Sequence, residues 1–587
     1  MRSLHGNPVA PGVALGQILL LEQPQERLAR RTVAETAIPD EVDRLEQALK
    51  QAVAALQHDR ERVERDLGPE AAQIFDVHLV LLQDKALIEP VRRLVTESRL
   101  TAASAVSEVF ADLAERFRGM GSQVFRDKAR DVLDLERRVL AIVLGRPQER
   151  LAEHGEGVIV IAHELTPADA AALQSDRVLA VVTEVGGRTD HTSIVASALG
   201  VPVVVGCADV VAEVQDGDTV IVDGTQGRVI MRPNEETTAR YLARRQRLER
   251  FRVSTADARA EDAVTTDGTS ISLQGNIEFV REIPGLLDFG GEGVGLYRTE
   301  FLYLTAETEP DEELLTQRYA EALQALHGRP LTLRTLDLGA DKYTQSMALV
   351  PERNPFLGLR SIRWCLQNQP TFRRQLRAAL RASVHGNLRI MFPLVTTVGE
   401  FRQAKLLLND VAEELKDEGH TVSPDIPVGM MVEVPSAAIQ APAFAKVADF
   451  FSIGTNDLIQ YTVAVDRGNE RVANLYTAAN PAVLRLVRSI VRAAERRRIP
   501  VSLCGEIAGD VTYTMLLIGL GLRTLSLVPA LIPRVREVIR RVSVEACERV
   551  AHRVSGLESE RGILRALREE LERVLPEIGD DDTVGRP

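Results

Sequence analysis

Cysteine is scarce in this chain, and none of it is paired in the sequence. The 587 residues include four cysteines: Cys207, Cys365, Cys504 and Cys547. None stands in a Cys-x-x-Cys pair, and none has a histidine at the spacing of a zinc site. The pattern predicts free thiols in a reducing compartment.

Long hydrophobic runs and an excess of positive charge are also missing. No window holds 18 uninterrupted apolar residues, so we expect no transmembrane helix. The apolar stretch 13–21 is interrupted by Gly16 and Gln17, and no small-residue cleavage site follows it, which indicates a strand and not a signal peptide. A net charge of −13 argues against general nucleic-acid binding. We therefore expect a cytoplasmic protein without membrane insertion.

The chain has the composition of a globular protein and a length that suits three or four domains. Apolar residues recur at helical spacing over 39–145, and the Arg-rich stretch 235–258 indicates a linker helix. The two histidines of the helical stretch, His58 and His78, are expected at its surface or at an interface. We predict a multidomain α/β protein. Its parts are a small α/β domain (1–24 and 146–232), an inserted all-α helical subdomain (25–145), a linker helix (233–262), a C-terminal TIM (β/α)8 barrel (263–575) and a disordered tail (576–587).

The barrel prediction depends on eight short apolar runs that alternate with helical segments. These runs are 271–277, 293–297, 331–338, 388–395, 428–434, 450–453, 501–504 and 524–528. Catalytic groups of such barrels stand at the carboxyl ends of the strands. Here polar residues stand near or just after the end of nearly every run: Asn276, Arg298, Glu300, Arg334, Asp337, Glu433, Asn456, Asp457 and Glu506.

Carboxylates and arginines dominate this predicted ring. Glu433 and Asp457 are hard oxygen ligands at the ends of adjacent strands, and such a pair commonly holds Mg²⁺ together with substrate oxygens. Four arginines stand in the ring or in nearby loops: Arg298, Arg334, Arg360 and Arg467. Arginine binds phosphate and carboxylate through paired hydrogen bonds. We therefore predict a small, multiply anionic ligand bound with Mg²⁺, while individual arginines could instead pair with structural carboxylates.

Two further residues suggest chemistry. Cys504 follows an apolar strand and precedes a glycine turn, so it is either a nucleophile, a proton donor or a buried structural thiol. His191 lies in a turn rich in glycine, threonine and serine, directly before a small-residue helix. Glycines let the backbone approach an anion, and a helix N-terminus favours negative charge. Together with the barrel, this predicts phosphoryl transfer from the barrel ligand to His191, for which the small domain swings about the linker.

Five segments are long and specific enough to compare with known families. They read GLYRTEFL at 295–302, NPFLG at 354–358, GTNDLIQYT at 454–462, DRGN at 466–469 and CGE at 504–506. These segments, the His191 segment and the helical segment 74–84 resemble the Enzyme I family of the bacterial phosphoenolpyruvate-dependent sugar phosphotransferase system. The resemblance runs from about residue 4 to residue 570.

This resemblance implies a reaction and assigns roles to residues. Phosphoenolpyruvate phosphorylates His191 on Nε2, pyruvate leaves, and phospho-His191 donates to a histidine of the small phosphocarrier protein HPr. Glu433 and Asp457 hold Mg²⁺, and Cys504 protonates the enolate carbon. The substrate-binding residues are Arg298, Arg334, Arg360, Asn456, Asp457 and Arg467. The resemblance also implies that the helical subdomain binds HPr and that the chain forms a homodimer through the barrel.

The chain departs from the family at a few positions. Ser197 stands where many relatives have arginine, and Ala340 stands where they usually have glycine. Lys85 and Ala86 replace acidic residues of some relatives on the carrier-facing helices. These departures leave open a regulatory homologue with reduced turnover, and the nitrogen branch of Enzyme I is a second alternative. A phosphoenolpyruvate synthase or pyruvate phosphate dikinase would need an ATP-binding domain for which 25–145 is too short.

Overall fold

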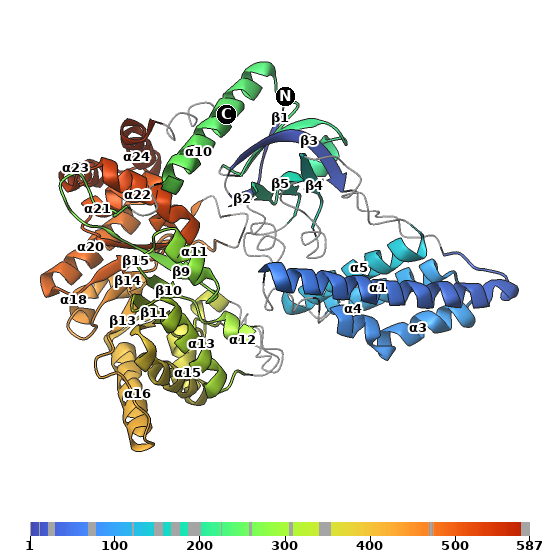
Figure 1. The fold of residues 1–587 in the computed structure, drawn as a ribbon, viewed down its shortest axis with the longest axis horizontal. Coiled ribbons are helices and arrows are strands. Elements are labelled where there is room, and N and C mark those ends of the chain that lie inside the picture. The colour runs from blue at the N-terminus through green and yellow to red at the C-terminus, as the bar shows by residue number, and fades with distance from the viewer. Residues whose placement is uncertain are drawn as a thin grey trace. The chain divides into compact units, whose positions relative to one another are not determined.

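The computed structural model describes residues 2–10, 12–21, 30–67, 75, 78–119, 123–145, 157–165, 177–185, 201–224, 226–257, 261–304, 309–339, 354–467, 469, 472 and 475–576. His191, Ser197, Ala340 and the predicted tail from residue 577 lie outside these residues. The chain divides into two compact units, Met1–Glu249 and Arg250–Pro587. Figure 1 shows the elements of both, and each unit is described by itself.

The first unit contains an eight-stranded mixed sheet in the order β1-β8-β7-β3-β4-β5-β6-β2. Its strands are β1 (Arg2–His5), β2 (Asn7–Ala10), β3 (Val13–Leu21), β4 (Val158–Ala162), β5 (Val178–Thr183), β6 (Val203–Val205), β7 (Thr219–Asp223) and β8 (Arg228–Met231). β3, β4, β5 and β6 run parallel, and their nearly continuous Val and Ile runs are buried. The N-terminal strands therefore complete a sheet whose other strands come after residue 157.

The same unit contains the predicted helical segment. Its helices include α1 (Ile38–Leu67), α3 (Lys85–Thr96), α4 (Ala102–Gly119) and α5 (Gln123–Val143), which Figure 1 shows lying along one another. Apolar residues at helical spacing, such as Leu45 and Leu56 on α1, meet Phe110 of α4 in one buried cluster. His58 is exposed as expected, but His78 is fully buried. The surface prediction for His78 is wrong because its ring packs between Phe75 and the acidic residues of α5.

The second unit is a closed barrel of eight parallel strands, as the sequence predicts. The strands are β9 (Ser272–Ile277), β10 (Val294–Tyr297), β11 (Pro330–Arg334), β12 (Asn387–Phe392), β13 (Val428–Val432), β14 (Phe451–Ile453), β15 (Val501–Leu503) and β16 (Thr524–Leu527). β16 pairs with β9 and closes the ring. All eight lie within or next to the predicted apolar runs, because strands covered on both faces need apolar side chains throughout.

Helices cover the outside of this barrel. They are α11 (Glu282–Asp288), α12 (Phe301–Leu304), α13 (Glu312–Ala325), α14 (Ser361–Gln367), α15 (Gln369–Ala382), α16 (Val398–Asp417), α17 (Pro435–Ile439), α18 (Ala441–Phe444), α19 (Thr455–Val463), α20 (Pro481–Arg497), α21 (Val511–Gly519), α22 (Ile532–Arg541), α23 (Val544–Ser555) and α24 (Glu560–Val574). Side-chain caps fix several starts, and at α16 Thr397 and Glu400 form a complete capping box. One large apolar cluster joins these helices to the strands.

The linker prediction corresponds to one long helix, α10 (Glu235–Asp257), which crosses the boundary between the units. The four cysteines are free thiols, and all four are buried. Throughout the described residues, no helix combines the length and the apolar character that a membrane span requires.

Candidate active site at the carboxyl ends of the barrel strands

Five residues that the sequence analysis places in the polar ring or its loops form a continuous chain of ion pairs. Arg334, the last residue of β11, lies 3.0 Å from Glu300 and 3.2 Å from Asp337. Arg360, just before α14, lies 2.9 Å from Asp337 and 3.6 Å from Asp457 at the start of α19. All five side chains are about nine-tenths buried. The fold therefore gathers charge from four separate segments of the chain at one end of the barrel.

Mutual pairing keeps Asp337 and Arg334 charged in spite of their burial. Burial alone would raise the pKa of Asp337, but Arg334 and Arg360 hold that pKa well below its usual range. Burial would equally lower the arginine pKa values, yet Glu300 and Asp337 keep the pKa of Arg334 above its usual range. The result is a rigid, desolvated cluster in which a guanidinium already points at carboxylate oxygens. The cluster contains three carboxylates and two guanidinium groups, so an anionic ligand there would need an added cation beside it.

Glu433 lies in surroundings that disfavour the ionised form of its carboxyl group. It follows β13, is 2% exposed and accepts a 2.6 Å hydrogen bond from the backbone N–H of Leu394. Burial raises the pKa of Glu433 well above its usual range, and the charges of Asp457 and Asp337 raise it further. Oδ1 of Asp457 is buried and has no hydrogen-bond partner among the described residues. Arg360 pairs with Asp457, but the buried Glu433 and the unpartnered Oδ1 of Asp457 still present carboxylate oxygens that a further cation would neutralise.

A magnesium ion suits the carboxylates of Glu433 and Asp457. The donors are two hard carboxylates from adjacent strand ends, which is the ligand type Mg²⁺ prefers. Within the described ranges no three His, Cys, Asp or Glu side chains are grouped closely enough to hold a metal by themselves. Substrate oxygens and water would have to supply the remaining ligands. Gly454 keeps this space open, since a Cβ there would stand 2.7 Å from Oε2 of Glu433.

Cys504 lies just after β15 with its sulfur buried. Its Sγ is 3.7 Å from the carbonyl oxygen of Ile453, and its own carbonyl accepts a 3.0 Å hydrogen bond from Nδ2 of Asn276. Burial raises the pKa of the Cys504 thiol to about 11. The negative charge of Glu433 raises this pKa further, while the positive charges of Arg334 and Arg298 lower it. At neutral pH the residue is a thiol that holds a proton, a state that suits a proton donor better than a nucleophile.

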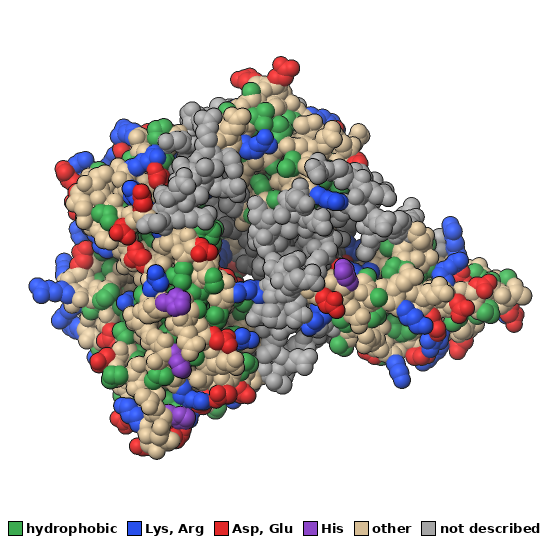
Figure 2. Space-filling model, viewed as in Figure 1, with side chains coloured by type: hydrophobic (Ala, Val, Ile, Leu, Met, Phe, Trp, Pro, Cys, Tyr) green, Lys and Arg blue, Asp and Glu red, His purple; other side chains and the backbone are tan. Residues whose placement is uncertain are grey.

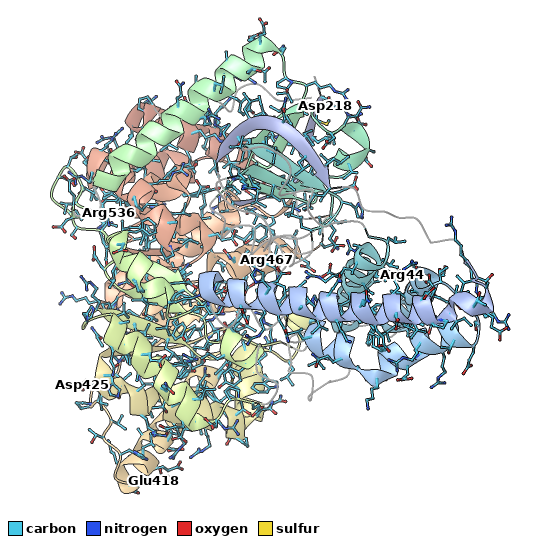
Figure 3. All side chains as sticks on the ribbon, turned by 45° about the vertical axis from the view of Figure 1, so that its right-hand side comes forward. Arg44, Asp218, Glu418, Asp425, Arg467 and Arg536 are labelled. Atoms are coloured by element: carbon cyan, nitrogen blue, oxygen red, sulfur yellow. The ribbon has the colours of Figure 1, made fainter. Side chains whose placement is uncertain are left out.

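The other predicted site residues are less buried. Arg298 forms a 2.8 Å ion pair with Glu278, and Asn456 exchanges two 3.0 Å hydrogen bonds with Glu506. Arg467, labelled in Figure 3, is exposed, and its backbone N–H donates to Oε1 of Gln460 at 3.2 Å. Their roles in substrate binding stay predictions. The expectation that some ring arginines pair with carboxylates is met by Arg298, Arg334 and Arg360.

Sequence reasoning missed two supporting residues. Ser361 donates a hydroxyl hydrogen bond to Asp337, and Leu394 donates its backbone N–H to Glu433. Both adopt left-handed backbone angles, with φ of 54° and 52°, which disfavour residues other than glycine. Their residue types carry no signal, because any residue can supply a backbone N–H and serine is common in loops. Only the folded backbone reveals them.

His191 lies outside the described residues, so its prediction remains untested. The sheet strands before it are described. His163 follows β4, Glu184 follows β5, and Nδ1 of His163 lies 2.5 Å from Oε2 of Glu184, within hydrogen-bond distance. The sequence analysis did not single out this pair.

Comparisons with known proteins match the chain over nearly its whole length. Residues 5–128 match the N-terminal domain of PEP-utilising enzymes, residues 154–227 their mobile domain and residues 252–544 their PEP-binding domain. A phosphoenolpyruvate-protein phosphotransferase from Priestia megaterium is 43% identical over 542 residues, covering 92% of this chain and 94% of that protein. The chain belongs to the phosphoenolpyruvate-protein phosphotransferase family.

Other members of this family are similarly close. The relative from Geobacillus stearothermophilus is 42% identical over 95% of this chain and 96% of its own length. The relative from Staphylococcus carnosus (strain TM300) is 40% identical over 94% and 96%. The family prediction and the prediction that the chain is a phosphotransferase enzyme are therefore confirmed. The charged cluster described above lies inside the segment that matches the PEP-binding domain.

Proposed function

We propose that phosphoenolpyruvate phosphorylates this protein on His191 with release of pyruvate, and that phospho-His191 then donates to a histidine of the carrier HPr. The observation that carries the proposal is the cluster of Arg334, Arg360, Glu433 and Asp457, which offers cations and hard oxygen ligands within a segment that matches a PEP-binding domain. Family membership over 92% of the chain supports the same reaction.

Substrate recognition follows from the distribution of charge. Phosphoenolpyruvate carries a phosphate and a carboxylate, and guanidinium groups bind both through paired hydrogen bonds. Arg334 and Arg360 are held in place by their ion pairs with Glu300, Asp337 and Asp457. Arg298, Asn456 and Arg467 would complete the binding of the two anionic groups from less buried positions. A small, multiply charged anion is the ligand class that this set suits.

The transfer itself breaks the P–O bond of phosphoenolpyruvate and forms a P–N bond to Nε2 of His191. The leaving group is the enolate of pyruvate, which becomes pyruvate when its terminal carbon accepts a proton. Cys504 is buried beside the cluster and holds a proton at neutral pH, so its thiol can supply that proton. Water then returns a proton to the sulfur. Each step balances without any redox partner.

Glu433 and Asp457 would hold Mg²⁺ in this scheme. Bound there, the ion would neutralise charge on the transferring phosphate. The Oδ1 of Asp457, which has no partner among the described residues, supports such a role. Burial raises the pKa of Glu433, and a bound cation would favour its charged form. Arg334 and Arg360 keep Asp337 ionised beside them.

Partners, location and domain roles complete the proposal. The predicted helical subdomain would bind HPr, the predicted linker 233–262 would allow the His191 domain to reach the barrel, and the barrel would form the homodimer. The reaction would take place in the cytoplasm as the first step of the sugar phosphotransferase system. These assignments follow the family and are supported here by the matches to its N-terminal, mobile and PEP-binding domains.

Incubation with labelled phosphoenolpyruvate and Mg²⁺ tests the proposal. Wild type should acquire acid-labile, base-stable label and release an equal amount of pyruvate. His191→Ala should acquire none, yet still bind phosphoenolpyruvate in calorimetry. If the variant loses both the label and the binding, the assignment of phosphorylation to the first unit and of phosphoenolpyruvate binding to the barrel is contradicted. Absence of label in wild type, with the ligand bound, would favour the regulatory alternative. Adding purified HPr to labelled wild type then tests the second transfer.

A further inference from the structure

A row of arginines without partners among the described residues lines a hollow on the outside of the barrel. The hollow has a volume of about 350 Å³ and lies between α18 and α20. Its lining consists of Pro442, Arg485, Arg488, Ser489, Arg492, Ala493 and Arg496. Figure 2 shows Lys and Arg side chains gathered over α18 and α20 at the left edge of the view. This place is separate from the strand-end site, because α20 packs against the outer face of the strands.

The arginines share one face of α20 because of their spacing. Positions 485, 488, 492 and 496 are three or four residues apart, which aligns them along a helix. The opposite face of α20, which includes Val487 and Ile490, is buried in the barrel cluster. The row spans eleven residues, or ~16 Å of helix. The short side chain of Ala493 leaves the space between the guanidinium groups open.

Nothing in the described chain neutralises this row. None of its four guanidinium groups forms a hydrogen bond or an ion pair with a described residue. The arginines of α15 provide the contrast within the same barrel, since every one of them is paired. Their partners are Glu414 for Arg373, Glu309 for Arg374, Glu312 and Glu418 for Arg377, and Glu312 and Glu313 for Arg381.

Four like charges on one helix face repel one another. The chain as a whole carries a net charge of −13, so this row is a local exception that its surroundings do not explain. We propose that the hollow on α20 is a binding site for a small molecule that carries several phosphate groups. A chain of phosphates presents closely spaced negative charge with several oxygens for each group, which matches four guanidinium groups along ~16 Å. The hydroxyl of Ser489 lies within the same lining and can donate to a phosphate oxygen.

Isothermal titration calorimetry with sodium tripolyphosphate, in the presence of a chelator, tests this site. The test variant is Arg488→Gln with Arg492→Gln, which removes two lining charges. The matched control is Arg497→Gln with Arg498→Gln, two exposed arginines that follow on the same segment but do not line the hollow. Wild type and control should bind equally within twofold, and the test variant at least tenfold more weakly. Thermal melts check that all three fold equally.

Competition separates this site from the strand-end site. For this competition the chelator is left out and His191→Ala is saturated with phosphoenolpyruvate and Mg²⁺. Tripolyphosphate binding should stay unchanged, and displacement would assign the anion to Arg334 and Arg360 and overturn the proposal. Absence of binding to wild type, or equal loss in both double variants, would overturn it too. A hexaglutamate peptide should bind at least tenfold more weakly than tripolyphosphate, and equal binding would mean an acidic protein segment instead. A titration with ATP without metal identifies the type of polyphosphate. Tighter binding of ATP than of tripolyphosphate would indicate a nucleotide ligand, and weaker binding an inorganic or sugar polyphosphate.

Discussion

Cys504 keeps its proton at physiological pH because burial raises the pKa of its thiol to about 11. If this proton is the one that converts the enolate to pyruvate, Cys504→Ala should lower the rate of pyruvate release ~10²-fold or more. Phosphoenolpyruvate binding should change little, since the arginines remain. A coupled assay for pyruvate and a calorimetric titration measure the two quantities. Cys547→Ala removes another buried thiol, on α23, and should leave both unchanged. Equal losses in the two variants would point to packing and not to proton transfer.

Glu282, in the first turn of α11, makes folding sensitive to pH. Burial raises its pKa to about 7, and the charge of Glu278 raises it further. An exposed glutamate titrates near ~4.3, so the folded state favours the protonated form. This stabilisation is fully present below the unfolded pKa and is lost as the pH rises through about 7.

Wild type should therefore lose stability between pH 5 and pH 8 relative to Glu282→Gln, by ~1–2 kcal/mol. The glutamine can still accept the hydrogen bond that the backbone N–H of Phe279 donates to Glu282. Thermal melts across this pH range measure the difference. Asp425→Asn, at an exposed carboxyl labelled in Figure 3, makes the same change in charge and should follow the wild-type curve. Parallel curves for wild type and Glu282→Gln would contradict the shift.

At the scale of elements, the junction between β14 and α19 depends on a glycine. A Cβ on Gly454 would meet Oε2 of Glu433 at 2.7 Å and Sδ of Met431 at 2.9 Å. Its φ of −87° is open to alanine, so the obstacle is space and not backbone strain. Gly454→Ala should displace the Glu433 carboxylate and lower the rate of pyruvate release at least ~10-fold, with weaker Mg²⁺ dependence.

Gly399→Ala on α16 is the matched control for this substitution. A Cβ there has its nearest neighbour at 3.7 Å, which is ordinary contact. Its activity should stay within twofold of wild type, and the added methyl favours the helix. If both variants keep full activity, the Glu433 carboxylate does not lie beside Gly454, where its hydrogen bond from Leu394 places it.

Element positions were predictable from the sequence where burial alone decides them. Parallel strands inside helices are apolar throughout, so eight runs sufficed to predict the barrel. The runs overshoot the strands, as at 331–338, where β11 ends at Arg334. After Arg334 the chain leaves the sheet and contributes Asp337 to the charged cluster. The apolar side chains of this segment remain buried, so the apolar run is longer than the strand.

The candidate site was predictable in residue types but not in contacts. Arg334, Glu433 and Asp457 follow strand ends, which the position in the chain already indicates. Which carboxylate each arginine contacts depends on register between β11, β12 and β13, and on backbone turns such as that at Ser361. Periodicity does not encode such turns. Pairing partners, burial and pKa shifts therefore came only from the structure.

At the scale of the whole molecule, each of the two compact units is stabilised by its own buried contacts. The first turns of α10 belong to the sheet, because Tyr241 packs in the cluster of Val13 and Ile230, and Arg244 pairs at 2.5 Å with the fully buried Asp223. The barrel has its own closed hydrogen-bonded ring and its own large apolar cluster. Units built in this way are expected to unfold as separate cooperative steps.

Calorimetry of the full chain should then resolve a barrel transition that responds to ligand and a second that does not. A ligand bound to one folded unit stabilises that unit by ~2.7 kcal/mol at a hundred times its Kd. Phosphoenolpyruvate with Mg²⁺ should therefore raise the barrel transition by a few degrees. His191→Ala is the variant to use, since it cannot consume the substrate and its barrel is intact. The shift should disappear in His191→Ala combined with Gly454→Ala. An equal shift of both transitions would mean that the ligand couples the two units, and that the barrel does not bind phosphoenolpyruvate independently.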